Sequence, residues 1–77
     1  MSPTVATFGN YRIEVRSREH GLPHVHVIGP DAEAVFILEP VRVKHQGNFS
    51  DRAVRQLTDF LIPREEMLLK TWKEFNP

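Results

Sequence analysis

Three of the four histidines of this chain, His20, His24 and His26, lie close together within residues 19–27 (EHGLPHVHV). Successive side chains of an extended strand alternate between its two faces, so His24 and His26 share one face while Val25 and Val27 share the other. Two imidazoles on one face, backed by valines that point toward a core, can hold a metal ion or transfer protons. This segment is therefore the candidate functional site of the chain.

The first hypothesis for this segment is a metal site. Zinc and related ions bind three or four nitrogen, sulfur or oxygen ligands, and a strand His-x-His supplies two of them from one face. We take His20 as the third ligand, which makes the predicted set His24, His26 and His20. Other candidates for the third position, which depend on the strand order, are His45, Glu19 and Asp31. The sequence requires no cofactor, and zinc or another transition metal is the one that this pattern would hold.

The second hypothesis is metal-free acid–base catalysis, because imidazole gains and loses a proton near neutral pH, with a pKa of about 6.5. The candidate catalytic residues are His20, His24 and His26. Arg12 or Arg16 would hold a phosphate beside them, as in small ribonucleases. The competing interpretation is structural, since alternation alone makes His24 and His26 the solvent-facing half of an amphipathic strand.

Length and composition narrow the class of protein. The 77 residues predict a single α+β domain, residues 1–77, with a thin core. The chain has no cysteine, which excludes disulfides and thiolate chemistry and favours the cytoplasm. The longest apolar run, residues 34–38, is far shorter than the roughly 20 residues of a membrane span, and the N-terminus lacks a signal-peptide pattern. We therefore expect a soluble, cytoplasmic protein that does not bind membranes.

The charges balance, with ten Lys and Arg against ten Asp and Glu. Nucleic-acid binding draws its strength from many Lys and Arg contacts to phosphates, so this balance disfavours a strong nucleic-acid binder. An RNA-contacting sheet face stays open as an alternative, and its members would be Arg12, Arg16, Arg18, Arg42 and Lys44. A net charge near zero does little to keep molecules apart, which favours a homodimer or a complex with a protein partner.

The first half of the chain predicts a small antiparallel sheet of about four strands in a meander. Alternating apolar and polar residues indicate strands at residues 11–16, 24–28 and 41–45. Residues 34–38 are apolar at consecutive positions, which predicts a strand buried on both faces or covered by another chain. Residues 4–8, followed by Gly9-Asn10, are compatible with a further short strand and a hairpin turn.

After residue 50 the apolar period changes to between three and four, which predicts helices. Ser50 or Asn48 would cap the first helix, whose apolar stripe is Val54, Leu57, Phe60 and Leu61. Pro63 is expected to end this helix and to begin a second one, which packs Leu68, Trp72 and Phe75 into the core. The predicted fold is thus α+β, with two C-terminal helices on one face of the sheet.

The chain also resembles a known family over nearly its whole length, from about Phe8 to Trp72. The resemblance to the small bacterial domain-of-unknown-function family DUF4160 rests on the order of elements, residues 19–27, residues 33–35 (EAV) and residues 64–68 (REEML) before Trp72. Family members typically read acidic-His-x-Pro-Pro-His-x-His, so the residues that carry over are His20, Pro23, His24 and His26. The departures are Leu22, where a first proline is usual, and Phe60, near the place of a common tryptophan.

The resemblance implies a genomic arrangement and not a reaction. The family's genes look like paired cassettes of bacterial and archaeal genomes, beside a second small domain of unknown function, which suggests a toxin–antitoxin role. The leading prediction is therefore an interaction module of a toxin–antitoxin-like pair, with a partner encoded nearby and the histidine segment as its functional surface. The alternatives are a metal-independent, histidine-dependent ribonuclease toxin and a metal-binding domain.

Overall fold

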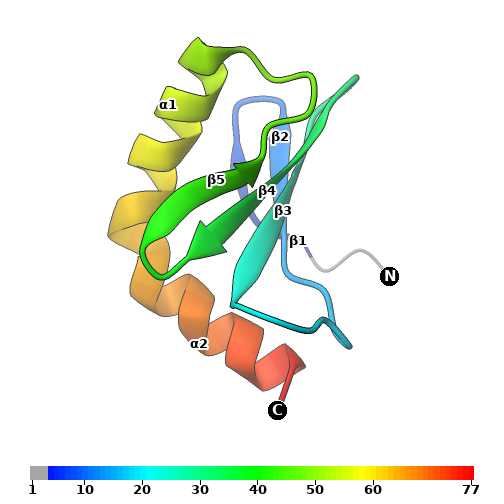
Figure 1. The fold of residues 1–77 in the computed structure, drawn as a ribbon, viewed down its shortest axis with the longest axis vertical. Coiled ribbons are helices and arrows are strands. Elements are labelled where there is room, and N and C mark those ends of the chain that lie inside the picture. Colours follow the sequence, from blue (N-terminus) through cyan, green and yellow to red (C-terminus); the bar gives the residue numbers. More distant parts are fainter. Residues whose placement is uncertain (1–3) are drawn as a thin grey trace.

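The computed structural model describes residues 4–77 and contains a five-stranded antiparallel sheet with helices along one side (Figure 1). The strands are β1 (Thr4–Phe8), β2 (Tyr11–Glu14), β3 (His24–Ile28), β4 (Glu33–Leu38) and β5 (Val41–His45). Each strand pairs with the next one along the chain, so the sheet is a meander whose edges are β1 and β5. The predicted α+β class and meander are confirmed.

The sheet has five strands and not four, because residues 4–8 pair with β2. Phe8 pairs with Tyr11 across the turn, where Gly9 has a φ of 59°. A two-residue hairpin turn requires such left-handed backbone, and glycine adopts it without the penalty that a Cβ brings. Val5, Ala6 and Phe8 pack against the core, so β1 is part of the same layer as the other strands.

The continuous apolar run is buried within this chain, because β4 lies between β3 and β5 in the sheet. Ala34, Phe36 and Leu38 are fully buried in the core that the helices cover. On the opposite face Ile37 is only 5 % exposed, and it pairs across the strands with His24. A covering chain is therefore not needed to explain why this strand is apolar on both faces.

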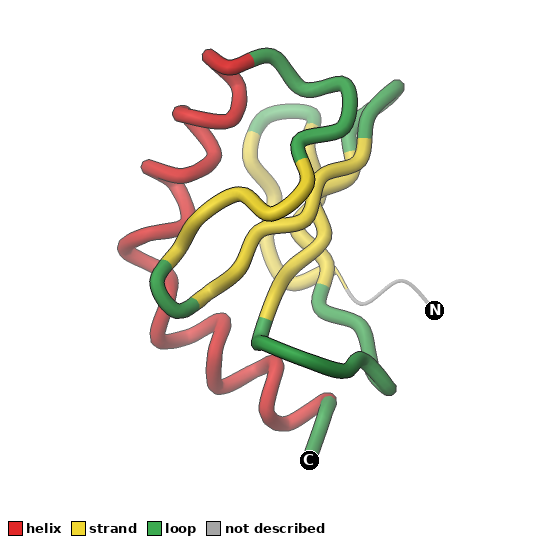
Figure 2. The backbone as a smooth tube through the Cα atoms, viewed as in Figure 1, coloured by secondary structure: helices red, strands yellow, loops and turns green. Residues whose placement is uncertain are grey.

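Residues 51–75 form one uninterrupted helical run, which corrects the prediction of two separate helices (Figure 2). It consists of α1 (Asp51–Leu61), the 3-10 turn η1 (Ile62–Arg64) and α2 (Glu65–Phe75). Pro63 has no N–H to donate, and the chain tightens around it, with the Glu65 amide donating to the Ile62 carbonyl. The proline thus changes the helix for one turn without ending it.

The helical run packs on the sheet through one apolar face. Ser50 caps α1, since its Oγ accepts a hydrogen bond from the Ala53 amide at 3.1 Å. Of the residues described, α1 packs mainly on β5 and α2 on β3 and β4, and the helical residues buried against the sheet include Leu57, Leu61, Leu68 and Trp72. Phe75 was expected in the core but is 38 % exposed. Among the described residues no helix is long and apolar enough to cross a membrane.

Candidate functional site

The histidine strand follows the predicted alternation. Val25 and Val27 are fully buried in the core, while the side chains of His24 and His26 lie on the opposite face, each 12 % exposed. The pairing of β3 with β4 continues to Pro23, whose carbonyl accepts a hydrogen bond from the Leu38 amide at 3.0 Å. The two imidazole rings are 5.2 Å apart between centroids and nearly perpendicular. The sheet therefore fixes both rings at one point on its surface.

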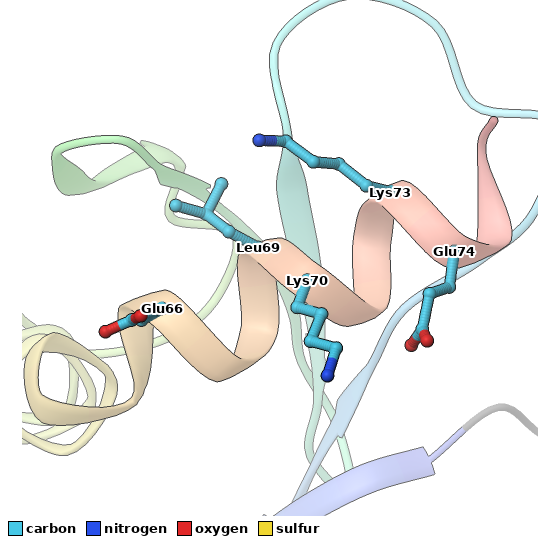
Figure 3. Close-up of a pocket in the computed structure, with 5 residues that line it drawn as sticks. All are labelled: Glu66, Leu69, Lys70, Lys73 and Glu74. Carbon is cyan, nitrogen blue, oxygen red and sulfur yellow. The ribbon is translucent and has the colours of Figure 1, made fainter.

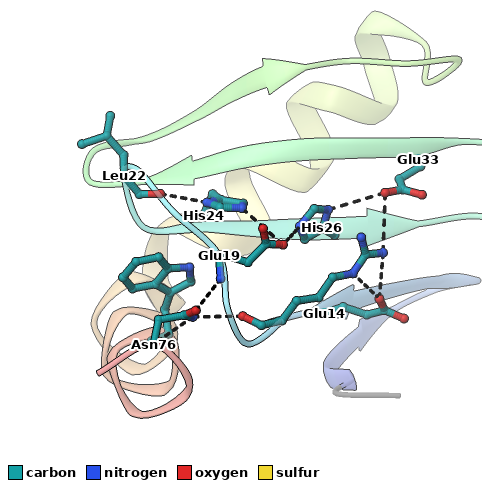
Figure 4. Close-up of polar contacts among 9 residues, drawn as sticks. Glu14, Glu19, Leu22, His24, His26, Glu33 and Asn76 are labelled. Atoms are coloured by element: carbon teal, nitrogen blue, oxygen red, sulfur yellow. Dashed lines mark hydrogen bonds and ion pairs between the residues drawn. The ribbon is translucent and has the colours of Figure 1, made fainter. Parts of the chain in front are cut away.

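Glu19 completes the cluster (Figure 4). Its Oε1 atom lies 2.8 Å from Nε2 of His26 and 3.7 Å from Nε2 of His24. Within the described residues, these three form the one group of potential ligands whose atoms all lie within 4.8 Å of one another. His20, predicted as the third member, is exposed and lies outside this group, as do the alternatives His45 and Asp31. The third member of the cluster in the structure is therefore Glu19.

The outer nitrogens of both rings face oxygen atoms. His24 Nδ1 lies 2.8 Å from the Leu22 carbonyl, and because a carbonyl only accepts, Nδ1 carries the proton and donates it. The other ring nitrogen of His24, Nε2, is the one that faces Glu19. His26 Nδ1 lies 3.5 Å from Oε2 of Glu33. This arrangement is typical of metal-binding histidines, whose second nitrogen is oriented by a carbonyl or carboxylate.

Carboxylates dominate the surroundings of the cluster. Glu14, opposite His26 in the sheet, is buried and forms an ion pair with Arg16 at 3.2 Å. Arg16 also reaches Glu33 at 3.5 Å, and Arg12 lies 3.8 Å from Glu14. Both arginines that the acid–base hypothesis assigned to a phosphate are thus engaged with carboxylates. Counting Glu19, this neighbourhood holds more carboxylates than guanidinium groups, so it favours a cation.

The Glu19 carboxylate stays ionised to lower pH than an ordinary glutamate. Partial burial favours the neutral acid and acts to raise its pKa. The hydrogen bond from His26 and the positive charges of His26, His24 and Arg16 outweigh that effect, so the pKa of Glu19 lies below its usual value. An ionised carboxylate beside two imidazoles is the form that binds a metal ion.

Two buried polar atoms beside the cluster lack hydrogen-bond partners. They are His26 Nδ1 and Trp72 Nε1, the only such side-chain atoms found in residues 4–77. Trp72 belongs to the core, as predicted, but its ring also lies 6.2 Å from that of His24. Unsatisfied buried groups are few in folded proteins, so each of them needs an explanation.

Some features of the site had no clear signal in the sequence. In the sequence Glu14 is an ordinary polar position of the amphipathic strand predicted at residues 11–16, and Glu33 directly precedes the apolar run at residues 34–38. Asn76, after the last residue of α2, hydrogen bonds to the backbone of residues 16 and 19 in the loop that carries Glu19. Only its place after a helix, where asparagine is common, could have drawn attention to it.

A second surface feature lies away from the histidines, on the outer side of α2. This groove, the α2 groove, has a volume of about 480 Å³ and is lined by Glu66, Leu69, Lys70, Lys73 and Glu74 (Figure 3). A neighbouring depression of about 490 Å³ shares Glu66 and Lys70 and adds Pro63 and Met67. Acidic and basic side chains therefore flank an apolar strip along one helix.

The fold and the site define a small α+β protein with a carboxylate–histidine cluster on one face of its sheet. The chain belongs to the family described as Domain of unknown function (DUF4160), whose model matches residues 10–73. This match confirms the resemblance seen in the sequence and includes all three cluster residues. No curated protein and no solved structure shows significant similarity to the chain.

Proposed function

We propose that this chain binds a divalent transition-metal ion through Glu19, His24 and His26. The observation that carries the proposal is the convergence of three ligand atoms, all within 4.8 Å of one another, from two oriented imidazoles and one carboxylate. Metal–ligand bonds of about 2.0–2.2 Å in a tetrahedral site place ligand atoms about 3.3–3.6 Å apart. The Glu19–His distances of 2.8 and 3.7 Å bracket that spacing.

The proton positions support the same assignment. A metal ion on Nε2 of a neutral imidazole leaves the ring proton on Nδ1. In His24 that proton already has its acceptor, the Leu22 carbonyl. In His26 it would point toward Glu33, which would give the unsatisfied Nδ1 atom a partner. Three protein ligands would leave one coordination position for water or another small ligand.

The ligand set indicates which ions are suited to the site. Two imidazoles and a carboxylate favour zinc, cobalt, nickel, copper or ferrous iron over calcium and magnesium, which prefer sites made of oxygen ligands. The excess of carboxylates favours a cation over the phosphate of an RNA substrate. For that reason we rank metal binding above the metal-independent ribonuclease.

Titration of tag-free protein with Co²⁺, followed by visible absorption, tests this proposal. We expect one ion per chain, with release of protons because only neutral imidazole coordinates. Glu19→Ala, His24→Ala and His26→Ala should each weaken binding by more than the roughly 10–100-fold that loss of an outer-shell partner costs.

Two other histidines provide matched controls, since His20 and His45 lie outside the cluster. His20→Ala and His45→Ala should bind Co²⁺ like the unchanged chain. Absence of Co²⁺ and Zn²⁺ binding near neutral pH, or equal losses in cluster and control variants, would refute the metal site.

A second candidate function is the interaction module of a toxin–antitoxin-like pair. The family resemblance suggests a partner, and the α2 groove supports one, because Met67, which lines the neighbouring depression, is 46 % exposed. The occupant we favour is a second copy of this chain, with the two α2 helices antiparallel. Antiparallel pairing about Leu69 and Lys70 would bring Glu66 of each copy to Lys73 of the other, so the two charges would be complementary.

A further inference from the structure

The loop that carries Glu19 has little regular structure of its own. It joins β2 to β3, and Arg18 and Gly21 in it have left-handed backbones, with φ of 61° and 87°. A non-glycine residue in this region costs on the order of 1–3 kcal/mol and persists only where its surroundings hold it. The position of the Glu19 carboxylate therefore depends on what fixes residues 16–19.

Asn76 is the residue that fixes this segment (Figure 4). Its Oδ1 atom accepts a hydrogen bond from the Glu19 amide at 2.8 Å, and its Nδ2 atom donates to the Arg16 carbonyl at 2.9 Å. Nδ2 also donates to the Trp72 carbonyl at 3.0 Å. The side-chain amide thus holds the backbone on both sides of Arg18 while it is tied to α2.

The helix end holds Asn76 in turn. The Asn76 amide donates to the Trp72 carbonyl at 2.9 Å, so its backbone caps the last turn of α2. Trp72 in the same turn is buried and lies against the His24 ring. The last turn of α2 therefore contacts both the backbone of the loop that carries Glu19 and the ring of His24.

We propose that Asn76 is a positioning residue for the metal site, a role that rests on the proposed function of Glu19, His24 and His26. It holds Glu19 at the histidines in advance of the ion, so binding does not have to order the loop. By thermodynamic linkage, an ion held through Glu19 must also strengthen the contact between Asn76 and the loop by the same factor. Metal binding and the docking of the α2 end are then coupled.

The test compares Asn76→Ala and Asn76→Asp with Asn48→Ala. Asn48 is a matched control, because its side chain also donates to a loop carbonyl, that of Asp31 at 3.3 Å, but away from the cluster. We expect Asn76→Ala to weaken Co²⁺ binding roughly 10-fold and to alter the Co²⁺ spectrum, in the range typical of outer-shell partners. Asn76→Asp keeps the acceptor for the Glu19 amide and should recover part of the loss, while Asn48→Ala should match the unchanged chain.

Hydrogen exchange of the Glu19 amide provides a second readout that needs no metal. The amide should exchange slowly in metal-free protein and in Asn76→Asp, and rapidly in Asn76→Ala. If the unchanged chain binds no Co²⁺, the metal site itself fails, and the exchange data still show whether Asn76 holds the loop. A folded Asn76→Ala variant with unchanged Co²⁺ affinity, spectrum and Glu19 exchange would overturn the proposal.

Discussion

His26 lies between two carboxylates, and each of its nitrogens has a different partner. Nε2 is 2.8 Å from Glu19, and Nδ1 is 3.5 Å from Glu33 without a hydrogen bond. A neutral ring that donates from Nε2 turns the lone pair of Nδ1 toward a negative charge. A metal ion on Nε2 would leave the ring proton on Nδ1, where it would point toward Glu33.

The lowered pKa of Glu19 predicts how metal-free stability varies with pH. A carboxyl whose folded pKa lies below its reference value of 4.5 stabilises the fold above about pH 4.5, and loses that contribution as the pH falls through the lowered value. Glu19→Gln should therefore be less stable than the unchanged chain at pH 6, with the difference shrinking toward pH 3. Urea unfolding in the presence of a chelator measures it.

Glu39→Gln is the control for this measurement, since Glu39 is exposed in the β4–β5 turn and forms no ion pair among the described residues. It should change stability little at any of these pH values. A pH-independent difference between Glu19→Gln and the unchanged chain would show that the carboxylate charge is not what stabilises this contact.

The residue-level features differ in how well the sequence predicts them. The shared face of His24 and His26 follows from strand alternation, a local rule that the structure confirms. Glu19 could be named only as one of several candidates, because its place depends on two left-handed residues in a loop. The contact that holds the loop joins positions 57 residues apart in the chain, and no local pattern encodes it.

At the scale of elements, the turn after β5 fixes the start of β4. Gly47 has a φ of 59°, and a Cβ at this position would overlap the carbonyl oxygen of Glu33. Glu33 is the first residue of β4, and its side chain is the one that faces His26 Nδ1. The close approach of the two backbones therefore helps to place a carboxylate at the site.

A comparison of Gly47→Ala with Gly9→Ala isolates the effect of this close approach. Both glycines have a φ of 59°, but a Cβ at Gly9 meets nothing within 4 Å. Each variant should lose about 1–2 kcal/mol from the left-handed backbone, and Gly47→Ala should lose about 1–3 kcal/mol more from the steric overlap. Urea unfolding measures both, and equal losses would contradict the assigned role of Gly47.

At two places the elements differ from what the local sequence pattern predicts. Pro63 was expected to separate two helices, but a single 3-10 turn accommodates it, because the apolar faces of α1 and α2 both remain on the sheet. Residues 4–8 have a weak strand pattern of their own, and pairing with β2 makes them a strand. In both cases tertiary packing, and not the intrinsic helix or strand propensity of the residues, determined the secondary structure.

At the scale of the whole molecule, the two proposed surfaces are built by the two sides of one helix. The inner side of α2 carries Leu68 and Trp72 to the core and ends at Asn76 beside the metal ligands. The outer side carries the α2 groove, whose lining runs from Glu66 to Glu74 and includes Lys73. A partner in the groove would therefore leave the histidine cluster accessible.

The homodimer proposal predicts the result of a charge exchange on this outer side. Sedimentation at micromolar concentration should show a dimer of the unchanged chain. Glu66→Lys should weaken the dimer roughly 10-fold, because two symmetric ion pairs of up to roughly 1 kcal/mol each would become repulsive. Adding Lys73→Glu to that variant should restore the dimer, while Glu39→Lys, a charge change at a residue that does not line the groove, should have no effect. If the chain is a monomer and binds the product of the neighbouring gene, then the partner in the groove is that product and not a second copy of this chain. A monomer that forms no such complex would refute the interaction module, and it would leave the metal site as the remaining functional assignment.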